Sequence, residues 1–224
     1  IGYGEIGIAL DKIFSKYYVV EHYDIKDDFI FRPDGESEVM HITIPYSKDF
    51  VKQVKKYQKY FKPKYTIIHS TVPPGTSRKC NALHSPVVGL HPFLEESIKT
   101  FTKFIGGEQA GEVADYFRRA NIKVYITDKQ ETTELMKIMC TTYHGLCIEF
   151  TKDIKRLCDK YKAPFELWTM WNQNYSDGYE QLGHPEYKRP NLIPIMKKIG
   201  GHCVLPNLEM IDSEFTKFLK ELNK

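Results

Sequence analysis

The chain has 224 residues, enough for one large domain or two small ones. Its 42% hydrophobic and 27% charged residues are typical of a folded globular protein and exclude a disordered tail or a membrane bundle. A formal net charge of +3 is too small for the basic face that binds nucleic acid. The cysteines include no CxxC pair, which argues against a disulfide framework or a zinc site. We therefore expect a soluble, cytoplasmic protein that binds no metal, nucleic acid or membrane.

The first residues form a glycine motif of the kind that binds dinucleotides. The run Gly2-Tyr3-Gly4-Glu5-Ile6-Gly7 matches GxGxxG, and apolar residues at helical spacing follow it. The first glycine allows a tight strand-to-helix turn, the second lets a pyrophosphate approach the backbone, and the third lets the helix pack closely. Because this motif normally follows a strand, we expect residues before Ile1 that form the first strand of the sheet.

A carboxylate follows at the distance expected for the ribose of NAD. Residues 17–23 are rich in β-forming side chains and predict a strand that ends at Asp24, about 20 residues after the motif. The Asp24 carboxylate would accept bonds from the ribose hydroxyls and repel a 2′-phosphate, which favours NAD over NADP. Lys26 could instead serve a phosphate, and Asp24 could be a simple turn residue.

Strands and helices alternate through the first half of the chain. The pattern predicts strands at 39–44, 65–69, 87–90 and 123–127, a helix at 47–61, and a turn-rich loop at 70–76. This alternation predicts an α/β fold, a Rossmann-type doubly wound parallel sheet with its ligand at the carboxyl ends of the strands. Gly2, Asp24, Pro45 and Thr71 all fall at such ends.

The second half of the chain is predicted to be a smaller all-helical domain. We place the cofactor domain at residues 1–127 and the helical domain at 128–224, which begins with a long helix at 131–161. Its apolar residues at steps of three, four or seven predict a buried stripe of Leu135, Met139, Leu146, Phe150 and Leu157. Lys137, Thr141 and His144 share another face, which could serve proton transfer or could simply be a solvated polar face.

A cysteine near the C-terminus stands in an unusual setting. Paired glycines precede Cys203 within the segment 200–207, and they would let the backbone approach a ligand. A nearby lysine could lower the pKa of this thiol and make it reactive. The alternative is an inert core cysteine, which flanking Gly, His and Pro make less favourable.

Together these motifs resemble the UDP-sugar 6-dehydrogenases, within the 6-phosphogluconate dehydrogenase-like superfamily. The glycine motif is similar to the cofactor loop of that family, and residues 70–76 resemble the loop beside the nicotinamide. Residues 134–137 with 148–150 resemble its central helix, and residues 200–203 resemble its nucleophile loop. The order and approximate spacing of the four motifs are kept along essentially the whole chain.

The resemblance implies a chemistry and a set of site residues. Cys203 would attack the aldehyde formed by a first hydride transfer, and a second transfer would leave a thioester for water to cleave. Lys137 would stabilise the oxyanion and Thr71 would position the water. The implied cofactor residues are Gly2, Gly4, Glu5, Ile6, Gly7, Asp24, Pro45, Ser70 and Thr71, and the implied substrate residues are Thr141, His144, His91, Gly201, His202 and Asn207. A small-molecule substrate, either a sugar nucleotide or a hydroxy acid, and a homodimer are expected.

Four departures from the family pattern keep other functions open. Thr141 stands where the family has Asn, and Asn207 stands where it usually has Asp, so the base for thioester hydrolysis is missing. The stretch 91–95 lacks an acid between Pro and Phe. The chain also has no room for the sugar-nucleotide domain that we expect from the family. The alternatives are a single-step hydroxyacid dehydrogenase that uses Lys137 and an inactive relative that only binds the cofactor.

Overall fold

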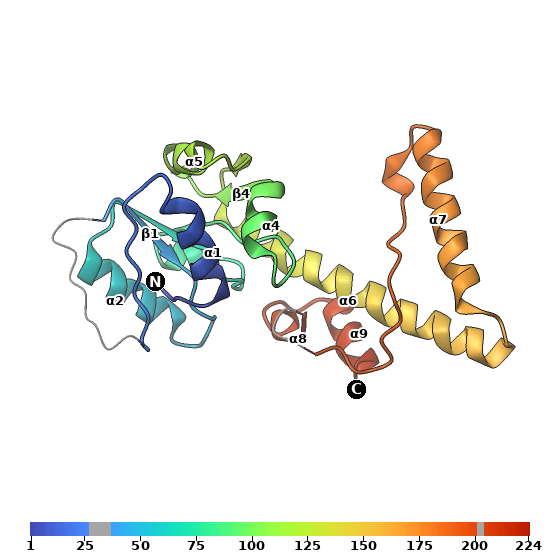
Figure 1. Cartoon of the computed structure of the whole chain (residues 1–224). Coiled ribbons are helices and arrows are strands. Elements are labelled where there is room, and N and C mark those ends of the chain that lie inside the picture. The colour runs from blue at the N-terminus through green and yellow to red at the C-terminus, as the bar shows by residue number, and fades with distance from the viewer. Residues whose placement is uncertain (27–36, 201–203) are drawn as a thin grey trace. The chain divides into compact units, whose positions relative to one another are not determined.

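The computed structural model describes residues 1–26, 37–200 and 204–224, which divide into two compact units. The first unit is Ile1–Ile138 and the second is Met139–Lys224. The sheet lies in the first unit, and the described part of the second unit is helical (Figure 1). The predicted fold class, a Rossmann-type α/β sheet followed by a helical region, is confirmed.

The sheet of the first unit has five described strands in the order of the sequence. They are β1 (Val39–Ile42), β2 (Tyr65–Ile68), β3 (Leu83–His84), β4 (Lys103–Gly106) and β5 (Val124–Thr127). Strands β1, β2 and β3 pair in parallel, and so do β4 and β5. Only the short contact of His84 with Gly106 is antiparallel. The sheet is therefore parallel over most of its width.

Helices cover both faces of this sheet because successive side chains of a strand point to opposite sides. The helices are α1 (Glu5–Phe14), α2 (Phe50–Phe61), α3 (Thr76–Lys79), α4 (Leu94–Thr100) and α5 (Ala110–Arg119). Ile67 of β2 belongs to a core with residues of α1, α4 and α5, whereas Ile68 packs with residues of α2. Both side chains are fully buried, and burying each of them stabilises the folded state by about 1.5–3 kcal/mol.

Two predicted strands are wrong. Residues 17–23 are turn and irregular backbone, and among the described residues only Tyr23 is bonded as a strand would be, through its carbonyl to the Gly2 N–H. Residues 87–90 are also irregular, because the strand lies earlier, at β3. Pro86 has no N–H for a ladder, and the Val87 carbonyl accepts a bond from the Lys137 side chain instead.

The second unit is built on most of a long helix. Helix α6 (Gln130–Tyr161) begins in the first unit and continues into the second, where α7 (Phe165–Gln181), the 3-10 turn Pro185–Tyr187, α8 (Val204–Leu208) and α9 (Glu214–Leu222) follow. Gly145 allows the close packing of α6 with the last two helices, since a Cβ there would lie 2.5 Å from Leu219 and 2.9 Å from Val204. Among the described helices, none is both long and apolar enough to cross a membrane.

The predicted buried stripe of α6 is wrong in its second half. Phe150 is 57% exposed and Leu157 is 42% exposed, whereas Leu135, Met139 and Leu146 are half-buried. The buried face instead carries polar residues, among them Glu134, Thr142, Glu149 and Lys152. Glu149 and Lys152 form an ion pair of 2.6 Å, which explains how two charges are buried on this face.

Candidate functional site

The glycine loop has a different steric requirement at each of its glycines. Gly2 has φ +89°, a conformation that side chains rarely adopt. A Cβ on Gly7 would lie 2.2 Å from the carbonyl oxygen of Gly2, so only glycine lets α1 start this close to the loop. Around Gly4 nothing lies within 4 Å of a Cβ position, and no side chain caps the start of α1. The amide groups of Glu5 and Ile6 thus face a space that an anionic ligand can enter.

Asp24 is tied to this loop and to its own turn. Its Oδ2 accepts the Tyr3 N–H at 2.7 Å, and its Oδ1 accepts the Lys26 N–H at 3.0 Å. These two backbone donors, the Tyr3 amide first, lower the pKa of Asp24 below its ordinary value. The Lys26 bond is an Asx-turn, so the turn role that the sequence left open is present. The charged carboxylate is held beside the glycine loop at the same time.

The other predicted residues of the carboxyl edge follow β1 and β2. Ser70 is buried and donates its hydroxyl to the Ile44 carbonyl at 2.5 Å, which joins the ends of the two strands. Pro45 is exposed and Thr71 is half-buried. The neighbouring Thr43 donates to the Gly2 carbonyl at 2.6 Å, so the glycine loop and the ends of β1 and β2 form one continuous edge.

Lys137 lies at the end of the first unit and contacts the segment after β3. Its Nζ donates to the Val87 carbonyl at 2.9 Å. A second lysine nearby, Lys103, is 3% exposed and donates to the carbonyls of Ser85 and Pro86 at 2.7 and 2.8 Å. Burial lowers the pKa of Lys103 well below its ordinary value, and the charge of Lys137 lowers it further. The sequence pattern gave no sign of this buried amine.

The structure brings two pairs of predicted substrate and cofactor residues together. His91 Nδ1 lies 2.6 Å from the Glu5 carboxylate in the first unit. In the second unit, the Asn207 side chain donates to the Thr141 hydroxyl at 3.1 Å. His144 is exposed on α6. Gly201, His202 and Cys203 lie outside the described residues.

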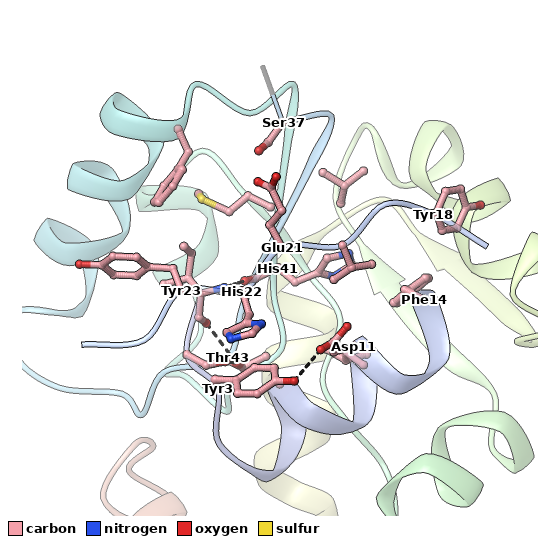
Figure 2. A pocket seen from close by; sticks show the side chains of 18 of the residues that line it. Tyr3, Asp11, Phe14, Tyr18, Glu21, His22, Tyr23, Ser37, His41 and Thr43 are labelled. Atoms are coloured by element: carbon pink, nitrogen blue, oxygen red, sulfur yellow. Dashed lines mark hydrogen bonds between the residues drawn. The ribbon is translucent and has the colours of Figure 1, made fainter. Parts of the chain in front are cut away.

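A hollow of about 580 Å³ lies beside α1, between the segment 18–23 and β1 (Figure 2). Its lining runs from Tyr3 and Thr43 at one end to Ser37 at the other, with Phe14 and Tyr18 along one side. Asp24, Ser70 and Thr71 do not line it. Gly2 and Gly7 do line it, so the hollow adjoins the glycine loop where we predict the cofactor but does not reach Asp24 or the 70–76 loop.

The backbone of Ile1 and Gly2 is paired on both sides beside this hollow. The Ile1 amine donates to the His41 carbonyl at 2.7 Å, and the Thr43 N–H donates to the Ile1 carbonyl at 2.9 Å. This is the bond pattern of parallel strands with Ile1 opposite Ile42. On its other side, the Gly2 N–H donates to the Tyr23 carbonyl at 2.8 Å. The hollow thus continues the line of Ile1 between β1 and residues 18–23.

The sequence analysis missed the polar groups that hold the 70–76 loop. Glu134 is fully buried, and its two oxygens accept the N–H groups of Gly75 and Ser77 at 2.6 and 2.8 Å. His84 is also fully buried, with Nδ1 2.7 Å from the Thr133 hydroxyl and Nε2 3.1 Å from the Ser70 carbonyl. Glu134 is visible in the sequence as a charged residue three positions before Lys137. Its bonding partners lie more than 50 residues away, so the sequence does not show what it binds.

Comparison with known sequences finds relatives among sugar-nucleotide dehydrogenases. A scan against described protein families gives no match. The chain is 25% identical over 175 residues to UDP-N-acetyl-D-mannosamine dehydrogenase of Methanococcus vannielii, an alignment that covers 70% of this chain and 38% of the relative. An equal match is found to the enzyme of the same name from Methanococcus maripaludis. The chain is therefore similar in sequence to UDP-sugar dehydrogenases over most of its length. It spans less than half the length of the curated relatives that it matches.

Solved structures share the fold. UDP-D-ManNAc dehydrogenase from Pyrococcus horikoshii superposes with a TM-score of 0.76 at 17% identity, covering 99% of this chain and 66% of that one. The 3-hydroxyisobutyrate dehydrogenase of Mycobacterium tuberculosis gives a TM-score of 0.72 at 12% identity, with 98% and 89% covered. A family member of the sugar-nucleotide type and a hydroxyacid dehydrogenase thus have the same arrangement of a sheet followed by long helices.

Proposed function

We propose that this chain binds NAD and serves an oxidoreductase that oxidises an alcohol of a sugar nucleotide or a related small molecule. The observation that carries the proposal is the glycine loop, with open space at Gly4, uncapped amides at the start of α1, and Asp24 held beside it. These features suit a pyrophosphate and an adjacent ribose. NAD, when bound, would accept the hydride. We propose residues 1–127 as the cofactor domain and 128–224 as the helical dimerisation domain.

NAD binding and its dependence on Asp24 test this proposal. We expect the chain to bind NAD more tightly than NADP, and Asp24→Asn to weaken NAD binding about 10- to 100-fold, since one charge-assisted hydrogen bond contributes about 1.5–3 kcal/mol. Titration calorimetry with both dinucleotides measures this.

Glu21→Gln is the matched control, because it removes one negative charge from an exposed side chain three residues earlier. This variant should bind NAD within about twofold of the wild type, an affinity difference below about 0.5 kcal/mol. Wild-type protein without measurable NAD affinity would contradict the proposal.

The catalytic groups that we propose are Lys137, Cys203 and Thr71. The ammonium group of Lys137, held by the Val87 carbonyl, is suited to stabilise negative charge on a reacting oxygen. Cys203 as nucleophile is a prediction from the sequence. In the second candidate function, a single-step hydroxyacid dehydrogenase, Lys137 does the acid–base work and Cys203 is incidental. The likeness to the mycobacterial enzyme supports this candidate. Turnover by Cys203→Ser separates the two, because only the covalent route needs the thiol.

An exposed apolar stripe on α6 supports the proposed homodimer. Tyr143, Phe150 and Leu157 follow one another at steps of seven residues and are 60%, 57% and 42% exposed. A repeat of seven keeps side chains on one seam of a helix, as at the contact between paired helices. We propose that a second copy of the chain covers this stripe.

Sedimentation of a charged variant tests the dimer. The wild type should sediment as a dimer, and Phe150→Asp should weaken the association at least about 100-fold, because a carboxylate would then be buried at an apolar contact. Arg156→Gln makes the same change in net charge on the same helix, at a side chain that is 55% exposed, and should leave the dimer intact. A monomeric wild type would contradict the proposal.

A further inference from the structure

The first turns of α6 are bonded to the loop between β2 and α3. The Glu134 carboxylate accepts the N–H groups of Gly75 and Ser77, one on each oxygen. One residue earlier, the Thr133 hydroxyl is hydrogen-bonded to Nδ1 of His84. The other ring nitrogen of His84, Nε2, donates to the Ser70 carbonyl. Both ends of the 70–76 loop are therefore held, directly or through one side chain, by consecutive residues of a single helix.

The Glu134 contact is made where water cannot replace it. Glu134 and Ser77 are fully buried. Burial raises the pKa of Glu134 above its ordinary value, and the bonds from Ser77 and Gly75 act in the opposite direction by favouring the carboxylate. Gly75 has φ +87°. Because glycine adopts positive and negative φ about equally readily, a local contact must select this conformation. The carboxylate supplies that constraint through two charge-assisted bonds.

The loop that Glu134 holds lies at the edge where a ligand of such a sheet binds. It follows β2, and its first residue donates to the Ile44 carbonyl just beyond β1. The glycine loop is bonded to Thr43 of the same strand end. The carboxyl ends of neighbouring parallel strands form the ligand crevice in this fold class. Displacement of the 70–76 loop would therefore change the wall of that crevice.

We propose that Glu134 is the positioning residue of this site: it fixes the 70–76 loop, and with it Thr71, in the conformation that receives the cofactor. The proposal rests on the proposed function, NAD binding, and adds to it a residue that touches neither cofactor nor substrate. Glu134 acts through the Gly75 and Ser77 amides. A loop whose amides are released would spend most of its time in conformations that bind NAD less well.

The test combines NAD titration calorimetry with amide hydrogen exchange of the full chain. Glu134→Gln keeps the shape of the side chain but turns an N–H towards one of the two amides. We expect NAD affinity to fall at least about tenfold. This corresponds to a variant whose loop is in the binding-competent conformation about one tenth of the time. Exchange at the Gly75 and Ser77 amides should accelerate, while amides of β4 keep wild-type protection. Glu134→Asp retains both acceptor oxygens at shorter reach and should give an intermediate affinity.

Glu131→Gln is the matched control. Glu131 lies one turn earlier on α6 and pairs with Arg78 at 2.7 Å, so its loss should leave NAD affinity within about twofold of the wild type. Wild-type NAD affinity in Glu134→Gln would overturn the inference, whether or not the loop amides exchange faster. An unchanged exchange rate at Gly75 and Ser77 would overturn it as well. A wild-type chain that binds no NAD would instead show that the proposed function has failed.

Discussion

Acidification from about pH 7.5 to about pH 5 is expected to destabilise the first unit by at least about 2 kcal/mol. The cause is a group of buried neutral histidines. Burial lowers the pKa of His84 and of His41 to about 3, and it lowers that of His69 well below the ordinary value. In the unfolded chain these imidazoles bind protons below about pH 6.5. Stability is therefore lost progressively as the pH falls from about 6.5 towards about 3.

Hydrogen-bond partners explain why these rings stay neutral. The Ser85 carbonyl can only accept, so His69 Nδ1, at 2.7 Å, carries the proton. His69 Nε2 must then accept from His41 Nδ1, which is 2.9 Å away. A third proton would make this pair cationic, no carboxylate among the described residues is bonded to either ring, and the Lys103 amine donates to the same Ser85 carbonyl. His41 also lines the hollow, so its contribution is smaller than that of the two fully buried rings.

Urea unfolding at several pH values measures the effect. The figure of about 2 kcal/mol at pH 5 comes from His84 alone. The pKa of this ring is about 3 in the folded chain and about 6.5 in the unfolded chain. His84→Gln keeps a donor for the Ser70 carbonyl but cannot titrate. Below pH 6 this variant should lose about 1.4 kcal/mol less per pH unit than the wild type. Added salt should leave the difference in place, because buried groups are poorly screened. Parallel pH profiles would contradict the explanation.

Local hydrophobic pattern was sufficient to predict most of the first unit. The β-forming residues of 39–42 and 65–68 and the helical spacing in 50–61 each specify an element through its own residues. The predicted strand at 17–23 failed because a strand also needs paired neighbours, and the described structure supplies residues 18–22 with none. The residues there do have β-forming side chains, but without a paired neighbour they form no strand.

The candidate site was predictable only where a motif has local steric causes. The glycines of residues 2–7 can be interpreted from spacing because the turn and the helix start are made by adjacent residues. Glu134 could not be predicted, because a buried carboxylate looks like a solvated one until its partners, 59 and 57 residues away, are known. The same holds for α6, where Phe150 and Leu157 of the predicted buried stripe are exposed. Periodicity does not tell whether a stripe faces the same chain or another one.

A chain extended by one apolar strand before Ile1 is expected to be more stable than the chain that begins at Ile1. The first part of the gain comes from the amine. Burial lowers the pKa of the Ile1 amino group from 8.0 to about 6, so the unfolded chain binds this proton more tightly than the folded chain. Stability is therefore lost as the pH falls from about 8 to about 6. Converting the amine to a peptide N–H removes this loss, about 1 kcal/mol at pH 7, and keeps the bond to the His41 carbonyl.

The second part of the gain comes from filling the hollow. With Ile1 opposite Ile42, five added residues would lie beside 37–41, the part of the chain that lines the hollow along β1. A Val/Ile strand there would bury its own side chains together with Leu10 and Phe14, which already face the hollow. After the entropy of ordering five residues, we expect a net gain of about 3 kcal/mol, or roughly 6–12 °C in Tm.

A glycine-serine extension of equal length separates the two parts. It removes the buried amine but has no apolar side chains to fill the hollow, so it should show only the pH-dependent gain. Scanning calorimetry at about pH 7 and about pH 9 distinguishes the contributions, because the amine effect vanishes above its unfolded pKa of about 8 whereas apolar burial persists. Amide exchange should slow at Met40 and at residues 18–22 in the strand extension alone. Equal stability of the two extended chains would show that the hollow between β1 and residues 18–23 does not accept a strand.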